Sequence, residues 1–589
     1  GRAHVRPALC RDRQEAMMLE LGRIGSVGEA IRDSIVTHKH NVALIEADRH
    51  RENVRYTYRE LREHAERFAA LLQSSDFAPD HRCAILMQNQ SKWLISATGA
   101  FWAGAVLMPL DYKLTAKEQL ALLAHGKPRV LVTEYSRFLD LRKEPDHPVL
   151  DKMLVLVTEA PDGVDLGRAQ RWEQEPRGTF TFVPRTREDI ACIVYSSGTS
   201  GTPKGCMLTH DNYLEQAQIL GRLYPMTEED RYFSVLPTNH AIDFMVGFIG
   251  PFLFGAAVVH QRTLRPQYLR ASLKKYEITH IALVPTILKN LEERIREKLD
   301  ELSEWQRRAI DGLTKVNEWL TAKRPRHELS RRLLKPLHDE MGGKLRLIFA
   351  GGAFIDPNTA RFFYELGFPV VIGYGLTEAS TVVTVNDLEP FRPDTVGKPV
   401  PGVEVEVRDA NAYGVGEVWV RGRTVMRGYL DAPELTAEAI VDGWLRTGDL
   451  GLVDAAGHIK LVGRAKNMIV TEGGKNIYPE DIESNFEDLP DCEEYCVFAA
   501  DYIWPQGKMT GEQLVIVVRP EEGGDASEAL VDELRKRNRR LADFKRLAGF
   551  IVENDEFPAT ASLKIKRNAL AERLRLRERS GAIVPLTVD

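Results

Sequence analysis

Short apolar segments alternate with helical segments along the first 290 residues, and this alternation constrains the fold most strongly. RCAILM (82–87) and VLVTE (130–134) are predicted as buried strands, whereas YTYRELREHAERFAALLQ (56–73) has helical periodicity. Buried strands separated by helices are typical of parallel sheets with helices on both faces. LRLIFAGGA (345–353) and FPVVIGYG (368–375) resume the strand pattern. We therefore expect an α/β protein built on parallel sheets.

Three later regions differ from this pattern. Residues 287–340 are highly charged and helical, which predicts a helical insertion. Between residues 400 and 463 strands shorten and glycine turns multiply, which predicts a small β unit. GRAKNMIV (463–470) begins a compact end region with a mixed strand and helix pattern. A length of 589 residues suggests about three to four folding units.

The charge and cysteine content exclude several classes of protein. The 79 Lys and Arg residues against 85 Asp and Glu residues give a net charge of −6. Nucleic-acid-binding proteins are usually basic, so we expect no nucleic-acid partner. Six cysteines cannot form a disulfide framework in a chain of this length, which predicts reduced thiols and a cytoplasmic location. The N-terminal GRAHVRPALCRDRQ has no apolar core and is not predicted to be a secretory signal.

The uncharged run FMVGFIGPFLFGAAVV (244–259) is too short to span a membrane, because a span needs about 20 apolar residues. Proline in a helix interior removes a backbone donor and clashes with the preceding turn. We therefore expect a buried helix that breaks at Pro251 and passes into a strand. The run has two alternative interpretations, as the lining of an acyl tunnel or as plain core packing.

Residues 195–205, YSSGTSGTPKG, follow the predicted strand DIACIVYSS (189–197). Glycine lets backbone amides approach an anion closely, and the hydroxyl side chains and Lys204 supply further donors. The loop is not a P-loop, because Pro203 precedes the lysine and Gly205 follows it. A flexible Ser/Gly turn is the alternative, but a run of this composition favours a polyphosphate-binding loop.

This loop resembles the nucleotide-binding signature of the adenylate-forming superfamily, which includes acyl-CoA synthetases, peptide-synthetase adenylation domains and luciferases. Further motifs resembling those of the superfamily follow in its order, and the resemblance covers residues 56 to 567. It implies a large N-terminal domain, residues 1–463, that binds ATP and the acyl group, and a small mobile α+β lid, residues 464–589. It also implies that the loop binds the phosphates of ATP through Tyr195, Ser196, Ser197, Gly198, Thr199, Ser200, Gly201, Thr202 and Lys204.

GYGLTEAS (373–380) ends a predicted buried strand and resembles a second superfamily motif. A carboxylate such as Glu378 can hold Mg²⁺, which offsets the charge of phosphates. The resemblance implies that Thr377 and Glu378 contact phosphate and metal. It also implies that Tyr374 stacks on adenine and that its sequence neighbours Gly373 and Gly375 belong to the nucleotide site. A lone glutamate would otherwise be predicted as a solvated surface charge.

Two further motifs resemble the contacts of the nucleoside. In FAGGAF (349–354), Gly351, Gly352 and Ala353 leave room for a flat base, although a Gly-Gly pair alone indicates only a turn. In WLRTGDLG (444–451), Asp449 resembles the aspartate that accepts hydrogen bonds from both ribose hydroxyls. A turn aspartate is the alternative for Asp449.

The resemblance places a hinge and the catalytic lysine in the C-terminal region. Arg464 resembles a nucleotide contact, and Lys466 occupies the position of the hinge between domain and lid. In EGGKNIYPEDIE (472–483), Gly473 and Gly474 resemble the turn that enters the active site during thioester formation, and the resemblance implies that Lys475 is a cofactor-binding residue. Lys564, in FPATASLKIKR (557–567), matches the catalytic lysine, although Leu563 replaces the usual preceding glycine. A cation suits the developing charge of an attack on the α-phosphate.

SVLPTNHAIDF (234–244) resembles the segment that lines the acyl pocket. The commonest form has two adjacent histidines, whereas here Asn239 replaces the first and His240 keeps the second. We expect His240 to line the pocket and to gate it or contact the substrate carboxylate. A hydrogen-bonded core histidine is the alternative.

These motifs imply that a carboxylate attacks Mg·ATP to give acyl-AMP and pyrophosphate, and that the thiol of CoA then displaces AMP. The insertion 287–340 resembles that of long-chain fatty acyl-CoA synthetases, so we expect a long-chain acid. An acyl carrier protein as acceptor, a medium-chain or aryl acid, a luciferase-like oxidation and a non-catalytic binding protein are the alternatives. Residues 323–335 hold six Lys or Arg against one Glu, which suits either the inner face of a membrane or solvated helix ends.

Overall fold

The computed structural model describes residues 21–174, 179–196, 204–301, 303–321, 326–467, 469–470, 476–504, 513–559 and 565–586. Contacts between Cα atoms divide the chain into two compact units. The first comprises residues 1–405 and 420–445, and the second comprises residues 406–419 and 446–589. The predicted boundary between residues 463 and 464 stays a prediction.

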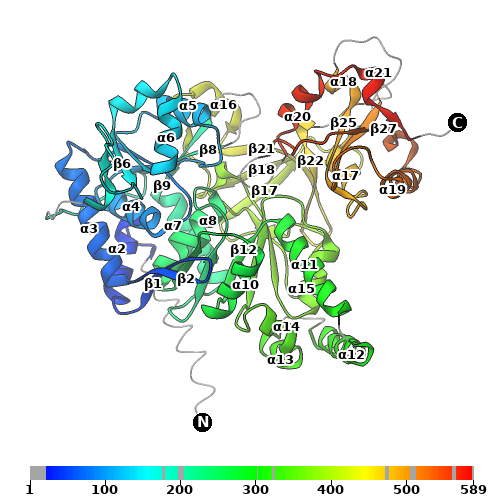
Figure 1. The fold of residues 1–589 in the computed structure, drawn as a ribbon, viewed down its shortest axis with the longest axis horizontal. Helices are drawn as coiled ribbons and strands as arrows, with labels where there is room; N and C mark the ends of the chain where they lie inside the picture. The colour runs from blue at the N-terminus through cyan, green and yellow to red at the C-terminus, as the bar shows by residue number, and fades with distance from the viewer. Residues whose placement is uncertain are drawn as a thin grey trace. The chain divides into compact units, whose positions relative to one another are not determined.

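A nine-stranded sheet forms one half of the first unit (Figure 1). Its strands from β14 to β1 are parallel, as the buried apolar runs predict, and antiparallel strands complete both edges. The strands in sheet order are β16 (Lys398–Pro399), β15 (Thr384–Val385), β14 (Val370–Tyr374), β13 (Leu347–Gly351), β12 (His280–Leu283), β10 (Arg231–Ser234), β11 (Ala257–Gln261), β1 (Val42–Asp48) and β2 (Arg51–Thr57).

An eight-stranded sheet forms the other half of this unit. Its central strands are again parallel, but β8, β9 and β19 pair antiparallel at one edge. The order is β19 (Gly428–Tyr429), β9 (Lys204–Thr209), β8 (Ile190–Ser196), β4 (Val106–Pro109), β3 (Arg82–Leu86), β5 (Val130–Glu134), β6 (Leu154–Thr158) and β7 (Gln170–Arg171). The predicted α/β class is confirmed.

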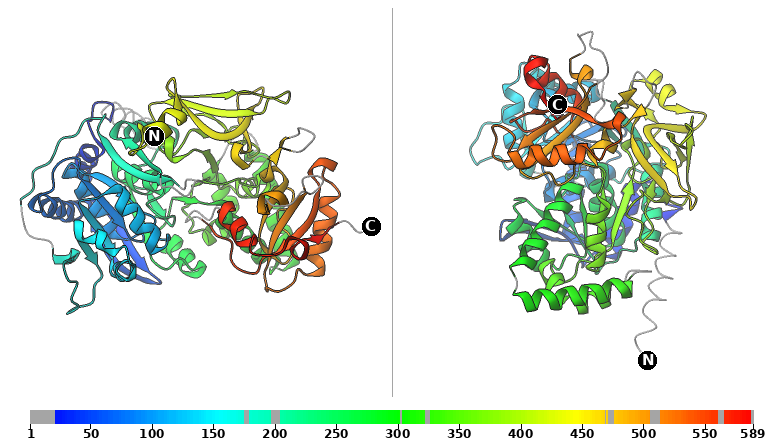
Figure 2. Two further views of the ribbon diagram at one scale, coloured as in Figure 1. Left: turned by 90° about the horizontal axis from the view of Figure 1, so that it is seen from above. Right: turned by 90° about the vertical axis from the view of Figure 1, so that its right-hand side faces the viewer.

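Helices cover both sheets (Figure 2). Where these helices start follows from the local sequence. The helix predicted at 56–73 is α3 (Tyr58–Ser74), because Thr57 caps it: Glu60 N–H donates to Thr57 Oγ1, and Thr57 N–H donates to the Glu60 carboxylate. The other helices are α2 (Val27–Thr37), α4 (Ser91–Trp102), α5 (Ala116–Gly126), α6 (Tyr135–Lys143), α7 (His210–Leu223), α10 (Pro266–Lys275), α15 (Pro357–Glu365) and α16 (Pro433–Ala439).

The prediction that the helix in residues 244–259 breaks at Pro251 is wrong. Helix α8 (Ala241–Phe244) continues through a π-helical segment, Met245–Ile249, into α9 (Gly250–Phe254), and Gly255 ends it with a φ of 75°. Pro251 lies in the first turn of α9, where no N–H donor is needed from it. In the π turn, Gly250 N–H donates to Met245 O, five residues earlier, instead of to the carbonyl four residues earlier. This shifts the hydrogen-bond register of the helix just before Pro251. The segment then enters β11 as predicted.

The predicted insertion is helical, with α11 (Pro285–Asp300), α12 (Glu304–Thr321), α13 (His327–Leu333) and α14 (Lys335–Glu340). Leu288 and Ile295 of α11 and Leu334 pack in the same core cluster as Phe363 of α15. Helix α12 contacts α13 and α15, and Asn317 donates from its amide to the carbonyl of Glu365. Helix α11 and Leu334 are therefore part of the hydrophobic core beside the nine-stranded sheet, whereas α12 lies on the surface, with Trp305 72% and Trp319 78% exposed.

The small β unit predicted between residues 400 and 463 is a five-stranded sheet. Its strands are β17 (Val403–Arg408), β18 (Gly416–Gly422), β20 (Ile440–Val441), β21 (Trp444–Val453) and β22 (Ile459–Arg464). The part of the second unit that follows residue 464 has the expected mixed pattern. It contains the strands β23 (Ile469–Val470), β24 (Asn476–Ile477), β25 (Cys492–Ala499), β26 (Leu514–Pro520), β27 (Leu547–Val552) and β28 (Val584–Pro585), and the helices α17 (Pro479–Glu483), α18 (Ala500–Ile503), α19 (Glu528–Asn538), α20 (Arg567–Leu574) and α21 (Arg579–Ala582).

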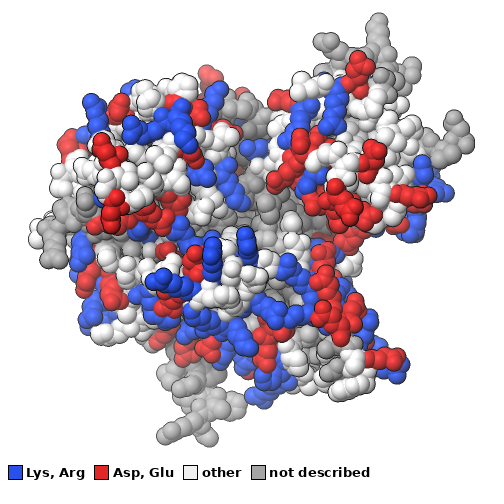
Figure 3. All heavy atoms as spheres, viewed as in Figure 1, with Lys and Arg blue, Asp and Glu red and all other residues white. Residues whose placement is uncertain are grey.

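Charges of both signs are interspersed among the described residues on the face drawn in Figure 3. Within the described ranges, no helix is both long enough and apolar enough to cross a bilayer. The five cysteines that these ranges include are free thiols.

Candidate active site

The predicted phosphate loop connects two antiparallel strands of the first unit. Ser196, the last residue of β8, is paired in register with Lys204, the first residue of β9, so the structure fixes both ends of the loop. Tyr195 lies beside them, and its hydroxyl is 2.9 Å from His125 Nδ1. The predicted contacts Ser197, Gly198, Thr199, Ser200, Gly201 and Thr202 lie outside the described residues.

Tyr429 joins the base of this loop to the second motif, and sequence reasoning missed it. Strand β19 pairs Tyr429 with Cys206 of β9, one strand away from Ser196. The Tyr429 hydroxyl donates to Glu378 Oε1 at 3.2 Å, and Lys204 Nζ lies 5.5 Å from the centre of its ring. Burial, together with the Glu378 charge, raises the pKa of Tyr429, so its hydroxyl remains a donor. The pairing of β19 with β9 is long-range, so no local motif indicates this role.

The GYGLTEAS motif forms a tight turn at the carboxyl end of β14. Gly375 is required there, because a Cβ atom would lie 1.5 Å from the carbonyl oxygen of Thr381. Thr377 and Glu378 follow in a short 3₁₀ turn. The Glu378 carbonyl accepts from the backbone N–H of Met426 at 2.8 Å. The loop that leads into β19 therefore holds Glu378 by its backbone as well as by its side chain.

The predicted adenine loop lies at the neighbouring strand end. Gly351 of β13 is paired with Gly373 of β14, so the two motifs are adjacent across the sheet. Gly352 is half-buried and Ala353 exposed, whereas Tyr374 is only 8% exposed. In α/β sheets ligands bind outside the carboxyl ends of the strands, which is where these residues lie.

Helix α8 connects the acyl-pocket segment to both nucleotide motifs. His240 is its N-cap residue and lies half-buried. The next carbonyl, of Ala241, accepts from Thr381 Oγ1 at 3.0 Å. Ile242 Cδ1 would lie 3.8 Å from a Cβ on Gly351, so the helix also packs on the adenine loop. The structure thus brings His240 close to the second motif and the glycine loop.

Asp449 and Arg464 form an ion pair in the second unit. They are opposite each other on β21 and β22, and Arg464 Nε lies 2.8 Å from Asp449 Oδ1. The Asp449 N–H donates to Thr447 Oγ1, and Asp449 is only 5% exposed. The structure therefore brings two predicted nucleotide contacts together.

The predicted hinge and catalytic lysine are only partly described. Lys466 lies in a 3₁₀ turn, Ala465–Asn467, directly after β22. The adjacent Asn467 amide donates to Glu480 Oε1 at 2.6 Å. Lys475 and Lys564 lie outside the described residues.

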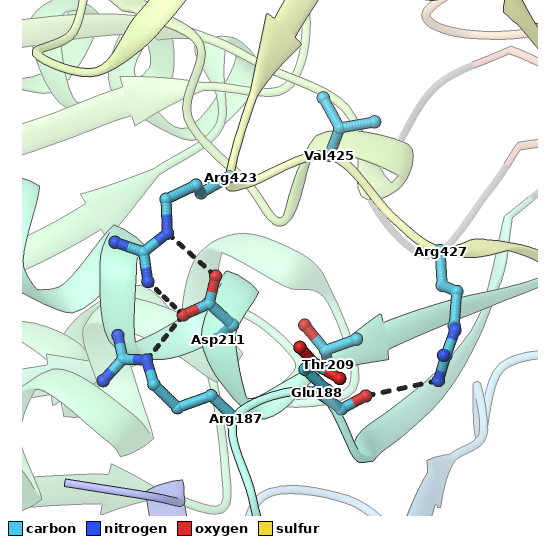
Figure 4. A pocket seen from close by; sticks show the side chains of 7 residues that line it. All are labelled: Arg187, Glu188, Thr209, Asp211, Arg423, Val425 and Arg427. Carbon is cyan, nitrogen blue, oxygen red and sulfur yellow. Dashed lines mark hydrogen bonds and ion pairs between the residues drawn. The ribbon is translucent and has the colours of Figure 1, made fainter. Parts of the chain in front are cut away.

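A surface pocket near the second motif carries three arginines (Figure 4). Asp211 Oδ1 accepts from Arg187 at 2.6 Å, and its other oxygen accepts from Arg423 at 3.0 Å. Glu215 contacts Arg423 at 2.9 Å, and Arg427 donates to the carbonyl of Glu188. Two of the guanidinium charges are therefore neutralised by carboxylates, which weakens this pocket as an anion site.

Glu378 fits the role of a single protein ligand to Mg²⁺. In the described part of the chain, no group of three or more His, Cys, Asp and Glu side chains could hold a metal alone. Mg²⁺ in phosphate chemistry is commonly bound by one or two carboxylates together with substrate phosphates and waters. A carboxylate beside a phosphate-binding loop meets this requirement, and the bound ion would offset the charge of the phosphates.

Comparisons with known proteins agree with this geometry. A family model described as AMP-binding enzyme matches residues 31–430. The 3-[(3aS,4S,7aS)-7a-methyl-1,5-dioxo-octahydro-1H-inden-4-yl]propanoyl:CoA ligase of Rhodococcus jostii is 30% identical over 547 residues, covering 88% of this chain and 94% of that protein. A long-chain-fatty-acid–CoA ligase of Mycobacterium bovis is 28% identical over 425 residues, covering 69% of each. ATP-bound MatB from Rhodopseudomonas palustris has a TM-score of 0.72 and 25% identity, over 91% of this chain and 96% of that one.

The fold and the site define an adenylate-forming enzyme. The chain belongs to the family of AMP-binding enzymes. The superfamily resemblance and the use of ATP, Mg²⁺ and CoA are confirmed, and the protein is an AMP-forming acid–CoA ligase. The identity of the acid and the roles of individual residues are proposals.

Proposed function

We propose that the protein activates a long-chain fatty acid as acyl-AMP and transfers the acyl group to CoA. The observation that supports a long chain is the insertion 287–340, which is helical as α11 to α14 and packs on the core through α11 and Leu334. This insertion resembles that of long-chain ligases, and one relative of that name matches 69% of the chain.

In the first half-reaction a carboxylate oxygen of the acid attacks the α-phosphorus of ATP, and the bond to the bridging oxygen of pyrophosphate breaks. The phosphate loop and Lys204 bind the phosphates, and Glu378 holds Mg²⁺ in a position supported by Tyr429. Lys564 supplies the cation for the developing charge. Orientation of the reactants accounts for much of the acceleration, since the reaction becomes effectively intramolecular.

In the second half-reaction the thiolate sulfur of CoA attacks the acyl carbon, and the acyl C–O bond to AMP breaks. Rotation at Lys466 removes Lys564 and introduces the turn that contains Lys475. Asp449 and Arg464 bind the ribose and nucleotide, which is consistent with their ion pair on adjacent strands.

Packing of the apolar run 244–259 favours core structure over a tunnel lining. Phe244 and Phe248 have ring centres 5.6 Å apart, and Phe248 and Phe252 have centres 5.3 Å apart. All three side chains are at most 2% exposed, and Trp93 packs against the first two. The acid is therefore proposed to enter along the half-buried His240 side of α8.

A ring-bearing acid is the second candidate substrate. The relative with 30% identity acts, according to its name, on a propanoyl chain attached to a fused bicyclic ring. The match to this chain covers 94% of that relative's length. Such an acid requires a wide, short pocket, whereas a fatty acid requires a narrow, long one.

Substrate competition tests this proposal. The protein is incubated with Mg·ATP, CoA and equimolar acids from acetate to stearate, together with benzoate and a bicyclic propanoate, and acyl-CoA products are quantified. We expect products to be dominated by chains of about 12 or more carbons, since each buried methylene contributes ~0.8 kcal/mol. Preference for the bicyclic acid would replace the fatty acid in the proposal. Acyl-AMP without acyl-CoA would instead indicate a carrier-protein acceptor.

A further inference from the structure

Asp243 is a fully buried carboxylate that accepts hydrogen bonds from three hydroxyl groups. Tyr232 Oη donates to Oδ1 at 2.9 Å, whereas Ser234 Oγ and Thr238 Oγ1 donate to Oδ2 at 2.7 and 2.8 Å. The residue has 0% exposure. A buried charge is costly unless its acceptor sites are satisfied, so these three donors are what makes the carboxylate tolerable.

One of these donors precedes the segment 235–240, which carries His240, and another lies within it. Ser234 ends β10, and Thr238 lies two residues before His240. From the other sheet, the Asn89 amide donates to Ser234 Oγ at 2.9 Å and to the carbonyl of Leu236 at 2.6 Å. Its Oδ1 accepts from the backbone N–H of Thr238. Asp243 and Asn89 therefore both hold the segment by hydrogen bonds.

The local backbone is shaped around the carboxylate. A Cβ on Gly247 would lie 2.5 Å from Asp243 Oδ1, so the absence of a side chain at this position leaves the carboxylate its space. Gly247 lies in the π-helical segment Met245–Ile249, which begins two residues after Asp243. π-Helical turns within α-helices are frequent at functional sites. Asp243 and Gly247 are four residues apart and lie on the same face of the helix, so the glycine leaves room for the carboxylate.

We propose that Asp243 is a positioning residue, which fixes the segment 235–240 through Ser234 and Thr238 and thereby sets the affinity for the carboxylic acid. This inference rests on the proposed function, because it assumes that His240 lines the acid pocket. The path is short: Thr238 precedes His240 by two residues, and the carbonyl of Ala241 accepts from Thr381, which directly follows the second motif. Loss of the Thr238 bond frees the segment on the acid side, while the phosphate loop stays in place.

Three substitutions separate this role from a structural one. Thr238→Val keeps the side-chain shape but removes the hydroxyl, and Thr238→Ser keeps the hydroxyl. Tyr232→Phe removes a hydrogen bond of 2.9 Å to the same carboxylate, against 2.8 Å for that of Thr238, but from strand β10 rather than from the segment. We expect Thr238→Val to raise the KM for the acid at least about fivefold, since a hydrogen bond to a charged group is lost. Thr238→Ser and Tyr232→Phe are expected to stay within about twofold of the parent.

The assay is acid-dependent ATP–pyrophosphate exchange at saturating ATP, with KM for ATP and thermal midpoints measured for every variant. An unchanged KM for the acid in Thr238→Val, or equal increases in Thr238→Val and Tyr232→Phe, overturns the proposal. If Thr238→Val proves unstable, Asn89→Ala removes the acceptor of the Thr238 N–H and the donor to the Leu236 carbonyl, and it is subject to the same criteria. Failure of every acid to support exchange by the parent protein would refute the proposed function instead, and would be seen before any variant is made.

Discussion

Glu378 is proposed to act through its negative charge. Glu378→Gln preserves the shape and the acceptor for Tyr429 but removes the negative charge that is proposed to hold Mg²⁺. We expect acid-dependent pyrophosphate exchange to fall about a hundredfold or more, and the Mg²⁺ concentration for half-maximal rate to rise, because the phosphate charge is then less well neutralised. A titration of exchange rate against Mg²⁺ measures both.

Tyr429→Phe is the matched control for that experiment. It removes only the hydroxyl that donates to Glu378, so we expect a decrease of about tenfold or less. Equal losses in the two variants would show that the tyrosine, rather than the carboxylate charge, is the important group.

Asp243 makes stability depend on pH in a predictable direction. Burial raises its pKa from 3.8 to about 6, against the opposing effect of its hydroxyl donors. The folded state therefore holds this proton more tightly than the unfolded state, so the stabilisation is complete below pH 3.8 and is lost as the pH rises through 6. Over this interval we expect the parent protein to lose up to about 3 kcal/mol of stability relative to Asp243→Asn. Thermal midpoints of the two proteins from pH 4 to 7 test this, and parallel curves would contradict it.

At the scale of elements, two glycines in helical segments have opposite roles. Gly247→Ala places a Cβ 2.5 Å from Asp243 Oδ1, so we expect a loss of about 1–3 kcal/mol and a raised KM for the acid. Gly312→Ala, within α12, meets nothing within 4 Å, so we expect a gain of about 0.5–1 kcal/mol without a change in KM. Thermal melts and acid titrations of both variants provide the comparison. A harmless Gly247→Ala would show that the carboxylate has more space than the structure indicates.

The sequence predicts these elements where one local pattern dominates. Strand β5 spans the predicted residues 130–134, and β8 and β13 fall within the predicted ranges, because buried strands require continuous apolar runs. The helix through Pro251 was not predictable, since the π turn that accommodates the proline depends on space made by tertiary packing. Tyr429 and Asp243 were missed for a related reason. Their partners are remote or lie in other elements, and no local spacing indicates a hydrogen bond formed across a fold.

At the scale of the whole molecule, the two half-reactions are proposed to use different residues. Lys564→Ala removes the cation for attack on the α-phosphate, so we expect adenylation to fall at least about a hundredfold. Thioester formation from added acyl-AMP and CoA should continue at a rate near that of the parent. Separate assays of the two steps measure this difference, and an equal loss in both would argue against the assignment of Lys564 to the first step.

The most direct test of the central claim is isotope transfer from the acid to AMP. A fatty acid labelled with ¹⁸O in its carboxylate is incubated with the protein, Mg·ATP and CoA, and the ¹⁸O content of the products is measured by mass spectrometry. Attack on the α-phosphate followed by cleavage of the acyl C–O bond predicts AMP that carries one ¹⁸O and unlabelled pyrophosphate. Label in inorganic phosphate, with ADP as the nucleotide product, would show activation at the γ-phosphate and contradict an adenylate-forming mechanism.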